Sequence, residues 1–187
     1  ARDCLVMPGL VNCHTHAAMT CFRGLADDME LMDWLNNYIF PAEAKNVDPE
    51  LAYWGSALAC AEMIRSGTTT FCDMYLFEDE TARAASEAGI RCLLGEGIFD
   101  FPSPNARTPE EGFAYTRMLI EKWADDPLVN FAIEPHSLYT CSPSVIKDAK
   151  ALADEYGIPF AIHLLENRGE VRQLTERLGM KATRFLR

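Results

Sequence analysis

Four histidines are the residues of this chain with the clearest chemical potential, and two of them form a His-x-His pair. They are His14, His16, His136 and His163. Residues two apart on a strand point to the same face of a sheet, so the imidazoles of His14 and His16 can approach one metal ion. Imidazole nitrogens bind zinc, iron and nickel. Because His163 ends a later apolar run, it offers a third ligand, and the three together predict a metal site.

The spacing of apolar residues indicates the elements that must position these histidines. The predicted strands are 10–16, 68–75, 91–99, 130–137 and 159–165. The predicted helices are 49–66, 78–88, 109–124, 142–156 and 169–178, and an inserted segment covers 34–44. Alternation of strands and helices is typical of βα units and a parallel sheet. All four histidines lie at the carboxyl ends of predicted strands, which is the edge where such proteins bind ligands.

Several acidic and histidine side chains at the same edge could assist a metal. Glu166 follows His163 by three positions, and a turn there would bring its carboxylate back toward the metal as a proton carrier. Its alternative role is a solvated loop acid or a charge at a helix N-terminus. His136 could polarise a reacting bond or be a hydrogen-bonded histidine at the rim. Asp73 and Glu96 are predicted to be buried carboxylates held by backbone or hydroxyl donors.

Cysteine and aromatic residues suggest further functions. Cys13 stands beside the first histidine, as in thiol nucleophiles activated by an imidazole. Alternation along the strand places Cys13 on the opposite face, which argues against this role. A hydrolase that used Cys13 or Cys141 would be inactivated by thiol alkylation and indifferent to chelators. Trp34, Tyr38 and Phe40 could stack on a flat ring, although aromatic residues at this density usually belong to the core.

The composition excludes some classes of protein. The 187 residues carry 17 Lys and Arg against 28 Asp and Glu, which gives a formal net charge of −11. This acidic surplus argues against binding to nucleic acid or to an anionic membrane, and no apolar run approaches the ~20 residues of a membrane span. The seven cysteines include no CxxC pair, so a reducing cytoplasm is expected rather than a disulfide framework.

Five segments of the chain resemble the amidohydrolase superfamily. They are PGLVNCHTHAAMTCFRGLADD, FPAEAKN, EMIRSGTTTFCDMY, EPHSLYTCSP and AIHLLEN. PGLVN-HxH with a downstream HxxE is specific for the superfamily. FPAEAK, SGTTTFCDMY and EPHSLYTCSP are similar to its branch of 5-methylthioadenosine/S-adenosylhomocysteine deaminases, which is related to chlorohydrolase-like proteins and to guanine and cytosine deaminases. The element pattern alone leaves open a doubly wound sheet or a barrel.

The resemblance implies an α/β fold, part of a (β/α)8 barrel. Residues 1–187 would form a fragment of a single barrel domain, with about the first five βα units, and would lack the β-sandwich and the last strands. Two further metal-site residues of the family, a histidine and an aspartate, would lie beyond residue 187. The isolated chain is therefore expected to aggregate or to stay partly unfolded, and to be inactive.

The resemblance also implies roles for individual residues. The implied ligands of one divalent metal, zinc or alternatively iron, are His14, His16 and His163. Glu166 corresponds to the acid that carries a proton to the purine ring, and His136 to a histidine near the reacting centre and the substrate. Glu43 corresponds to the carboxylate that holds the ribose hydroxyls. Trp34 would lie against the ligand, and Arg107 would meet an amino-acid tail.

The implied reaction is metal-dependent hydrolytic deamination of an adenine-type nucleoside, giving an inosine-type product and ammonia. Candidate substrates are 5'-methylthioadenosine, S-adenosylhomocysteine and adenosine, and the full-length enzyme would be a cytoplasmic homo-oligomer. One alternative is another ring deaminase or chlorohydrolase of the superfamily, acting on guanine, cytosine or a triazine. Another is an inactive metal-binding fragment.

Overall fold

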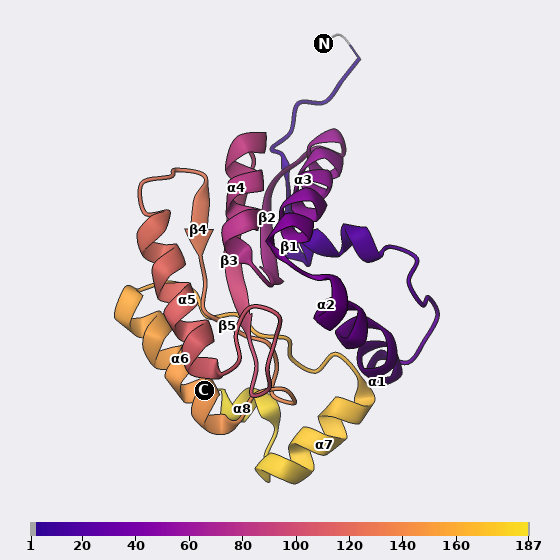
Figure 1. Ribbon diagram of the computed structural model, residues 1–187, viewed down its shortest axis with the longest axis vertical. Helices are drawn as coiled ribbons and strands as arrows, with labels where there is room; N and C mark the ends of the chain where they lie inside the picture. Colours follow the sequence, from indigo (N-terminus) through magenta and orange to yellow (C-terminus); the bar gives the residue numbers. More distant parts are fainter. Residues whose placement is uncertain (1–2, 187) are drawn as a thin grey trace.

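The structure is a computed structural model that describes residues 3–186 (Figure 1). The strands are β1 (Leu10–Thr15), β2 (Thr68–Tyr75), β3 (Arg91–Ile98), β4 (Val129–Phe131) and β5 (Glu134–Pro135). The longer helices are α3 (Pro49–Arg65), α4 (Glu78–Ala88), α5 (Pro109–Lys122), α6 (Pro143–Tyr156) and α7 (Arg168–Leu178). The shorter helices are η1 (Ala17–Phe22), α1 (Leu31–Trp34), η2 (Leu35–Ile39), α2 (Phe40–Asn46) and α8 (Ala182–Phe185).

The strands form a parallel sheet in chain order. β1 pairs with β2, β2 with β3, and β3 with both β4 and β5. The predicted strand 130–137 is therefore interrupted, and Pro135 in its second half has no N–H to donate to a ladder. The predicted strand 159–165 forms two isolated parallel bridges, Ile133 with Phe160 and Ser137 with His163. It extends the sheet as an irregular segment rather than as a continuous strand.

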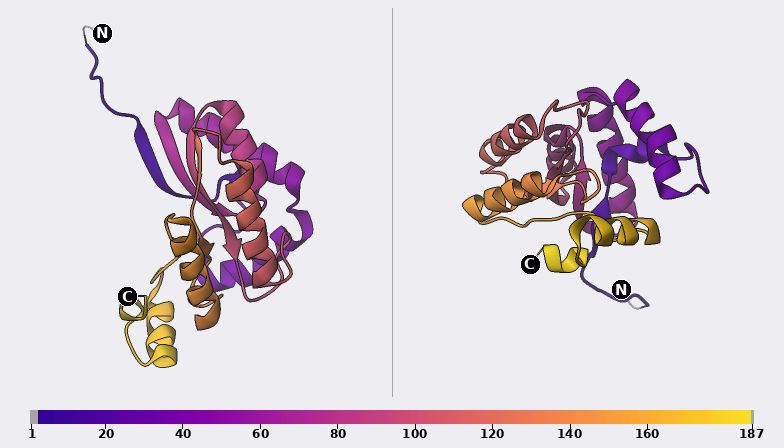
Figure 2. Two further views of the ribbon diagram at one scale, coloured as in Figure 1. Left: turned by 90° about the vertical axis from the view of Figure 1, so that its left-hand side faces the viewer. Right: turned by 90° about the horizontal axis from the view of Figure 1, so that it is seen from below.

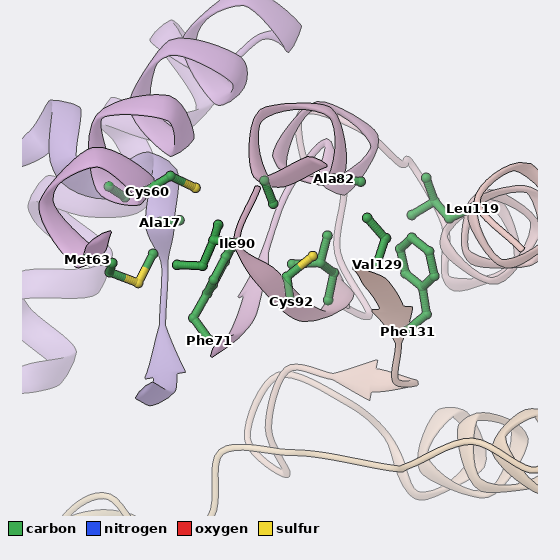
Figure 3. Packing of buried hydrophobic residues seen from close by; sticks show 13 residues of the cluster. Ala17, Cys60, Met63, Phe71, Ala82, Ile90, Cys92, Leu119, Val129 and Phe131 are labelled. Carbon is green, nitrogen blue, oxygen red and sulfur yellow. The ribbon is translucent and has the colours of Figure 1, made fainter. Parts of the chain in front are cut away.

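Helices α3, α4 and α5 lie together on one face of the sheet (Figures 1 and 2). The core on this face is built from side chains of the strands and of these helices, as Figure 3 shows for Phe71, Cys92, Leu119 and Phe131. Phe71 and Leu119 are fully buried. Burial of one such large apolar side chain contributes roughly 1.5–3 kcal/mol, so this layer fixes β2 and β3 in place.

The helices begin where the sequence predicts because side chains cap their first turns. In each case the cap accepts a hydrogen bond from the backbone N–H three residues later. The caps of α3, α5, α6 and α7 are Asp48, Thr108, Ser142 and Asn167. A proline follows three of them at the first helical position, where its missing N–H costs no hydrogen bond.

Helix α3 also packs very closely against η1, the short helix that follows β1. A Cβ atom at Gly55 would lie 2.5 Å from the carbonyl oxygen of Ala18, so only glycine fits at this crossing. The Thr20 hydroxyl donates to the Gly55 carbonyl oxygen at 2.8 Å. The crossing therefore ties the segment after β1 to an outer helix.

The inserted segment predicted at 34–44 is helical and consists of α1, η2 and α2. Leu35 and Ile39 are buried in the described structure, and the segment lies near the carboxyl ends of the strands (Figure 1). Within the described part of the chain, no helix combines the length and the apolar character needed to cross a membrane.

Candidate metal centre and active site

The structure brings together the three histidines that the sequence suggests as metal ligands. One ring nitrogen from each of His14, His16 and His163 lies within 4.8 Å of the others. The Nε2 atoms of His14 and His16 are 3.3 Å apart, which is close to the separation of two ligands bound at ~2.0–2.1 Å to one tetrahedral zinc ion. The ring centroid of His163 lies 5.1 Å from that of His14 and 5.2 Å from that of His16.

Backbone carbonyls fix the orientation of two of these rings. His16 Nδ1 lies 2.6 Å from the Met74 carbonyl oxygen, and His163 Nδ1 lies 2.9 Å from the His136 carbonyl oxygen. A carbonyl oxygen can only accept, so Nδ1 carries the proton in both rings and Nε2 keeps its lone pair. Metal-binding histidines are commonly oriented by such a hydrogen bond. The donor set therefore fits a zinc or iron ion.

Three consecutive residues of β2 hold the carboxyl end of β1. The contacts are Thr15 Oγ1 to the Cys72 carbonyl oxygen at 2.7 Å, His16 Nδ1 to the Met74 carbonyl oxygen at 2.6 Å, and Ala17 N to Asp73 Oδ1 at 2.6 Å. Because β2 is itself buried between β1 and β3, these contacts fix the His-x-His pair to the centre of the sheet.

Glu166 lies close to the three clustered histidines, as the predicted turn requires. Leu165 has a φ of 60°, a left-handed conformation that is uncommon for leucine and that turns the chain just before Glu166. The Tyr139 hydroxyl donates to Glu166 Oε2 at 3.1 Å. Glu166 is exposed and lines one cavity together with His14 and His163.

His136 is half-buried beside the three clustered histidines, with its ring centroid 4.8 Å from that of His163. Its Nδ1 is 2.9 Å from Thr140 Oγ1, and its ring lies 4.8 Å from the ring of Phe99. Burial, reinforced by His163 and His16, lowers the pKa of His136 to about 3. The imidazole is therefore neutral near pH 7 and can form hydrogen bonds to a ligand without carrying a charge.

A second cavity adjoins the first and contains most of the predicted site residues. Six of them line it: His16, Trp34, Glu43, His136, His163 and Glu166. Its other walls are mainly apolar and come from η1, η2, α2 and the ends of β2 and β3. An apolar pocket with a few converging polar groups is the usual form of a small-molecule site.

Glu43 of α2 is one of two carboxyl groups that line this second cavity, the other being Glu166. Burial raises the pKa of Glu43 to about 7. The neighbouring Tyr75 hydroxyl is buried, and no described residue is its hydrogen-bond partner. A ligand with hydroxyl groups could satisfy both side chains. Tyr75 and Tyr139 also line this cavity but are not among the predicted site residues. Tyr75 ends a predicted strand, and Tyr139 follows His136 by three positions.

Arg107 is the predicted site residue that the structure does not place on these cavities. Its side chain is exposed in the loop before α5, and its backbone N–H donates to Glu111 Oε2 at 2.7 Å. Among the aromatic candidates, Trp34 and Phe40 line the second cavity rather than the core, whereas Tyr38 is exposed.

Cys13 lies on the same cavity as His14, although strict alternation predicts the opposite face. The register of β1 against β2 shifts between Asn12 and Thr15, so the pattern of alternating faces does not extend through this end of the strand.

Asp73 and Glu96 are buried carboxylates held by backbone donors, as predicted. Glu96 accepts hydrogen bonds from the backbone N–H groups of Phe77 and Glu78 at 3.3 and 3.1 Å, and from Asn105 Nδ2 at 2.8 Å. Asp73 accepts from the backbone N–H of Ala17, the first residue of η1. Each carboxyl group therefore contacts the first residue of a helix, where negative charge is favourable.

The chain matches known proteins along nearly its whole length. The model of the amidohydrolase family matches residues 5–186. A 5-methylthioadenosine/S-adenosylhomocysteine deaminase 1 of Syntrophus aciditrophicus is 71% identical over 186 residues, which are 100% of this chain and 42% of that protein. The corresponding deaminase of Syntrophobacter fumaroxidans is 55% identical over 183 residues, which are 98% of this chain and 42% of that protein.

A solved structure shows the same fold. The crystal structure of an adenosine deaminase from Xanthomonas campestris with bound zinc has a TM-score of 0.92 and 40% sequence identity, over 96% of this chain and 41% of that chain. The chain thus spans less than half the length of these relatives, and its parallel sheet corresponds to part of an amidohydrolase barrel.

Proposed function

This chain belongs to the amidohydrolase family, and from that premise we propose that the protein carrying it is a metal-dependent aminohydrolase acting on an adenine-type nucleoside. The observation that carries the proposal is the clustering of the His14, His16 and His163 ring nitrogens, together with Glu166, which shares one cavity with His14 and the adjoining cavity with His16. The names of the relatives support 5'-methylthioadenosine, S-adenosylhomocysteine and adenosine as substrates. The reaction consumes one water molecule and releases ammonia and an inosine-type product.

His14, His16 and His163 would hold one divalent cation. The zinc of the Xanthomonas structure supports zinc rather than iron. When bound, such a cation lowers the pKa of a coordinated water toward about 7, which makes hydroxide available near neutral pH. The contribution of the chain is to keep the Nε2 lone pairs directed at one point through the Nδ1 hydrogen bonds.

Glu166 is proposed to give a proton to the ring nitrogen next to the carbon that bears the amino group. Protonation there lets the ring accept electrons as water adds to that carbon. The hydrogen bond from Tyr139 occupies Oε2, so Oε1 is the oxygen left to face the base. Neutral His136 would hydrogen-bond the substrate near the reacting centre.

The sugar side of the substrate would lie in the second cavity. Glu43 is proposed to accept hydrogen bonds from the ribose hydroxyls, and Trp34 to lie against the ligand. Buried polar groups left unpaired by an analogue that lacks these hydroxyls would discriminate strongly against it. Arg107 is proposed to meet an amino-acid tail that reaches beyond the cavity. A cytoplasmic location and a homo-oligomeric assembly remain predictions.

The test is a side-by-side assay of methylthioadenosine, S-adenosylhomocysteine, adenosine, guanine and cytosine, with zinc and iron contents measured on the same preparation. We expect ammonia release from the adenine-type nucleosides, loss of that activity with a chelator, and no effect of thiol alkylation. Preference for guanine or cytosine would contradict the substrate class. Inactivation by alkylation without sensitivity to chelators would favour a cysteine hydrolase.

A further inference from the structure

Two buried carboxyl groups behind the metal site have no role in the proposed reaction. Asp73 of β2 and Glu78, the first residue of α4, are both 0% exposed. Asp73 Oδ1 accepts the hydrogen bond from Ala17 N, but Asp73 Oδ2 and both carboxyl oxygens of Glu78 have no partner among the described residues. Neither group takes part in an ion pair within residues 3–186.

A shared proton accounts for these unpartnered oxygens. Two adjacent buried carboxylates without a cation cannot both be charged at reasonable cost. Burial, followed by the charge of Asp73, raises the pKa of Glu78 well above its usual range. Glu78 is therefore the group that keeps its proton, and as a hydrogen-bond donor it can pair with the neighbouring Asp73 carboxylate. Asp73 Oδ1 remains the acceptor for the backbone N–H of Ala17.

The backbone N–H that donates to Asp73 belongs to Ala17, the residue after a proposed metal ligand. Helix η1 begins at Ala17, and His16 at its N-cap position makes no side-chain capping bond. Asp73 supplies the missing acceptor from a neighbouring strand. Together with the Met74 carbonyl, it holds His16 on both sides: one contact at the ring and one at the next peptide.

We propose that Asp73, supported by Glu78 as hydrogen-bond donor, is a positioning residue for His16 and so sets the affinity of the site for its metal. The inference rests on the metal site of the proposed function. It assigns a role to two side chains that touch neither the cation nor the substrate, since they act through the backbone of Ala17.

The test measures the zinc dissociation constant by chelator competition, in variants of the protein that carries this chain. Thermal unfolding shows which variants are folded. We expect Asp73→Ala to weaken zinc binding by about 10–100-fold, as is usual when a partner behind a ligand is lost. Asp73→Asn keeps an oxygen for the Ala17 N–H and should stay within about threefold of the wild type.

Two substitutions at Glu78 keep the proposal testable if Asp73→Ala does not fold. Glu78→Gln retains a donor toward Asp73 and should leave zinc affinity unchanged, whereas Glu78→Met removes the donor and should weaken binding by roughly 3–10-fold. Thr116→Val is the matched control, because this buried hydroxyl donates to the Gly112 carbonyl oxygen within α5 and is hydrogen-bonded to neither Ala17 nor Glu78. It should lower stability without changing zinc affinity.

The outcomes separate the two proposals. A wild-type protein that binds no divalent metal would overturn the proposed function. A wild-type protein that binds zinc, with Asp73→Ala equal to it within twofold, would overturn only the role of Asp73. Equal zinc affinities of Glu78→Gln and Glu78→Met would overturn the supporting role of Glu78, and an equal loss of affinity in Thr116→Val would overturn the role of Asp73.

Discussion

His16 and Glu166 line the same cavity, but the chain holds them by different means. The β1 end, residues 14–17, is fixed by three contacts to consecutive residues of a regular buried strand. The acid segment, residues 164–166, follows two isolated bridges and contains the left-handed Leu165. Its carboxylate is exposed and is held by one side-chain hydrogen bond, from Tyr139.

This difference suggests a division of labour. Metal ligands must keep their positions through the whole reaction, and a sheet interior supplies that rigidity. A proton carrier must reach the substrate at one oxygen and later give up its proton, so a turn at the rim of the sheet suits it better. Substitutions at the β1 end are therefore expected to remove bound metal and activity together, whereas substitutions in the acid segment are expected to remove activity alone.

The largest effect is expected at the β1 end. His14→Ala removes one of three ligands, so we expect metal content and turnover to be lost together, with a decrease in kcat/KM of about 10⁴-fold or more. The measurement is metal analysis and ammonia release on the same sample. Turnover that persists in a metal-depleted variant would contradict the metal site.

The acid segment should respond differently. Glu166→Gln keeps the hydrogen bond from Tyr139 but cannot donate the proton, so kcat should fall by about 10²–10³-fold with bound zinc unchanged. Metal content and kcat are measured together. Loss of zinc in this variant would show that the two regions are not separable.

The pH dependence of kcat/KM tests the proposed contact between Glu43 and the sugar hydroxyls. Its pKa of about 7 means that it is ionised above pH 7 and neutral below, and the ionised form accepts hydroxyl hydrogen bonds best. The kcat/KM for methylthioadenosine should therefore fall toward acid by up to tenfold per pH unit. Glu43→Gln should lower kcat/KM at pH 8 by about 10–100-fold and remove this limb of the profile. A limb that survives the substitution belongs to another group.

The hydrogen bond from Tyr139 is expected to hold the Glu166 carboxylate in position. Tyr139→Phe removes the hydrogen bond to Glu166 Oε2, and we expect kcat to fall by up to about tenfold with KM and zinc affinity unchanged. The measurement is kcat together with zinc content on the same preparation. An unchanged kcat would mean that Glu166 is positioned without Tyr139.

The smallest effect is expected at Arg107, outside both regions. An exposed charge pair contributes about 0–1 kcal/mol, so Arg107→Ala should lower kcat/KM for S-adenosylhomocysteine by up to about fivefold. The same variant should leave methylthioadenosine, which has no amino-acid tail, unaffected. Equal losses on both substrates would contradict a contact with the tail.

Most of the fold could be predicted from the sequence because its signals are local. Asp48-Pro49 and Ser142-Pro143 mark helix starts through one side chain and one ring, and the structure confirms both. The irregularity of 159–165 could not be foreseen, because it depends on which backbone groups of 133–137 are free to pair. Pairing between distant segments is not encoded in either segment alone.

The candidate site, like the fold, could be predicted only in part from the sequence. His14, His16 and His163 could be placed together because parallel strands end at a common edge. The hydrogen bond between Tyr139 and Glu166 joins residues 27 positions apart, and no period or motif in the sequence predicts it. The role of Arg107 is implied by the resemblance alone, because the loop that contains it has no periodic pattern. Arg107 is exposed and lines neither cavity.

The contact between Gly55 and Ala18 has a consequence for anyone who alters this protein. Position 55 lies on an outer helix, where a substitution to alanine would ordinarily favour helix formation. Here an added methyl group would displace η1, and the disturbance would pass to the peptide of Ala17. Libraries aimed at thermostability should therefore leave residue 55 fixed, and any change there is best screened by metal retention as well as by melting temperature.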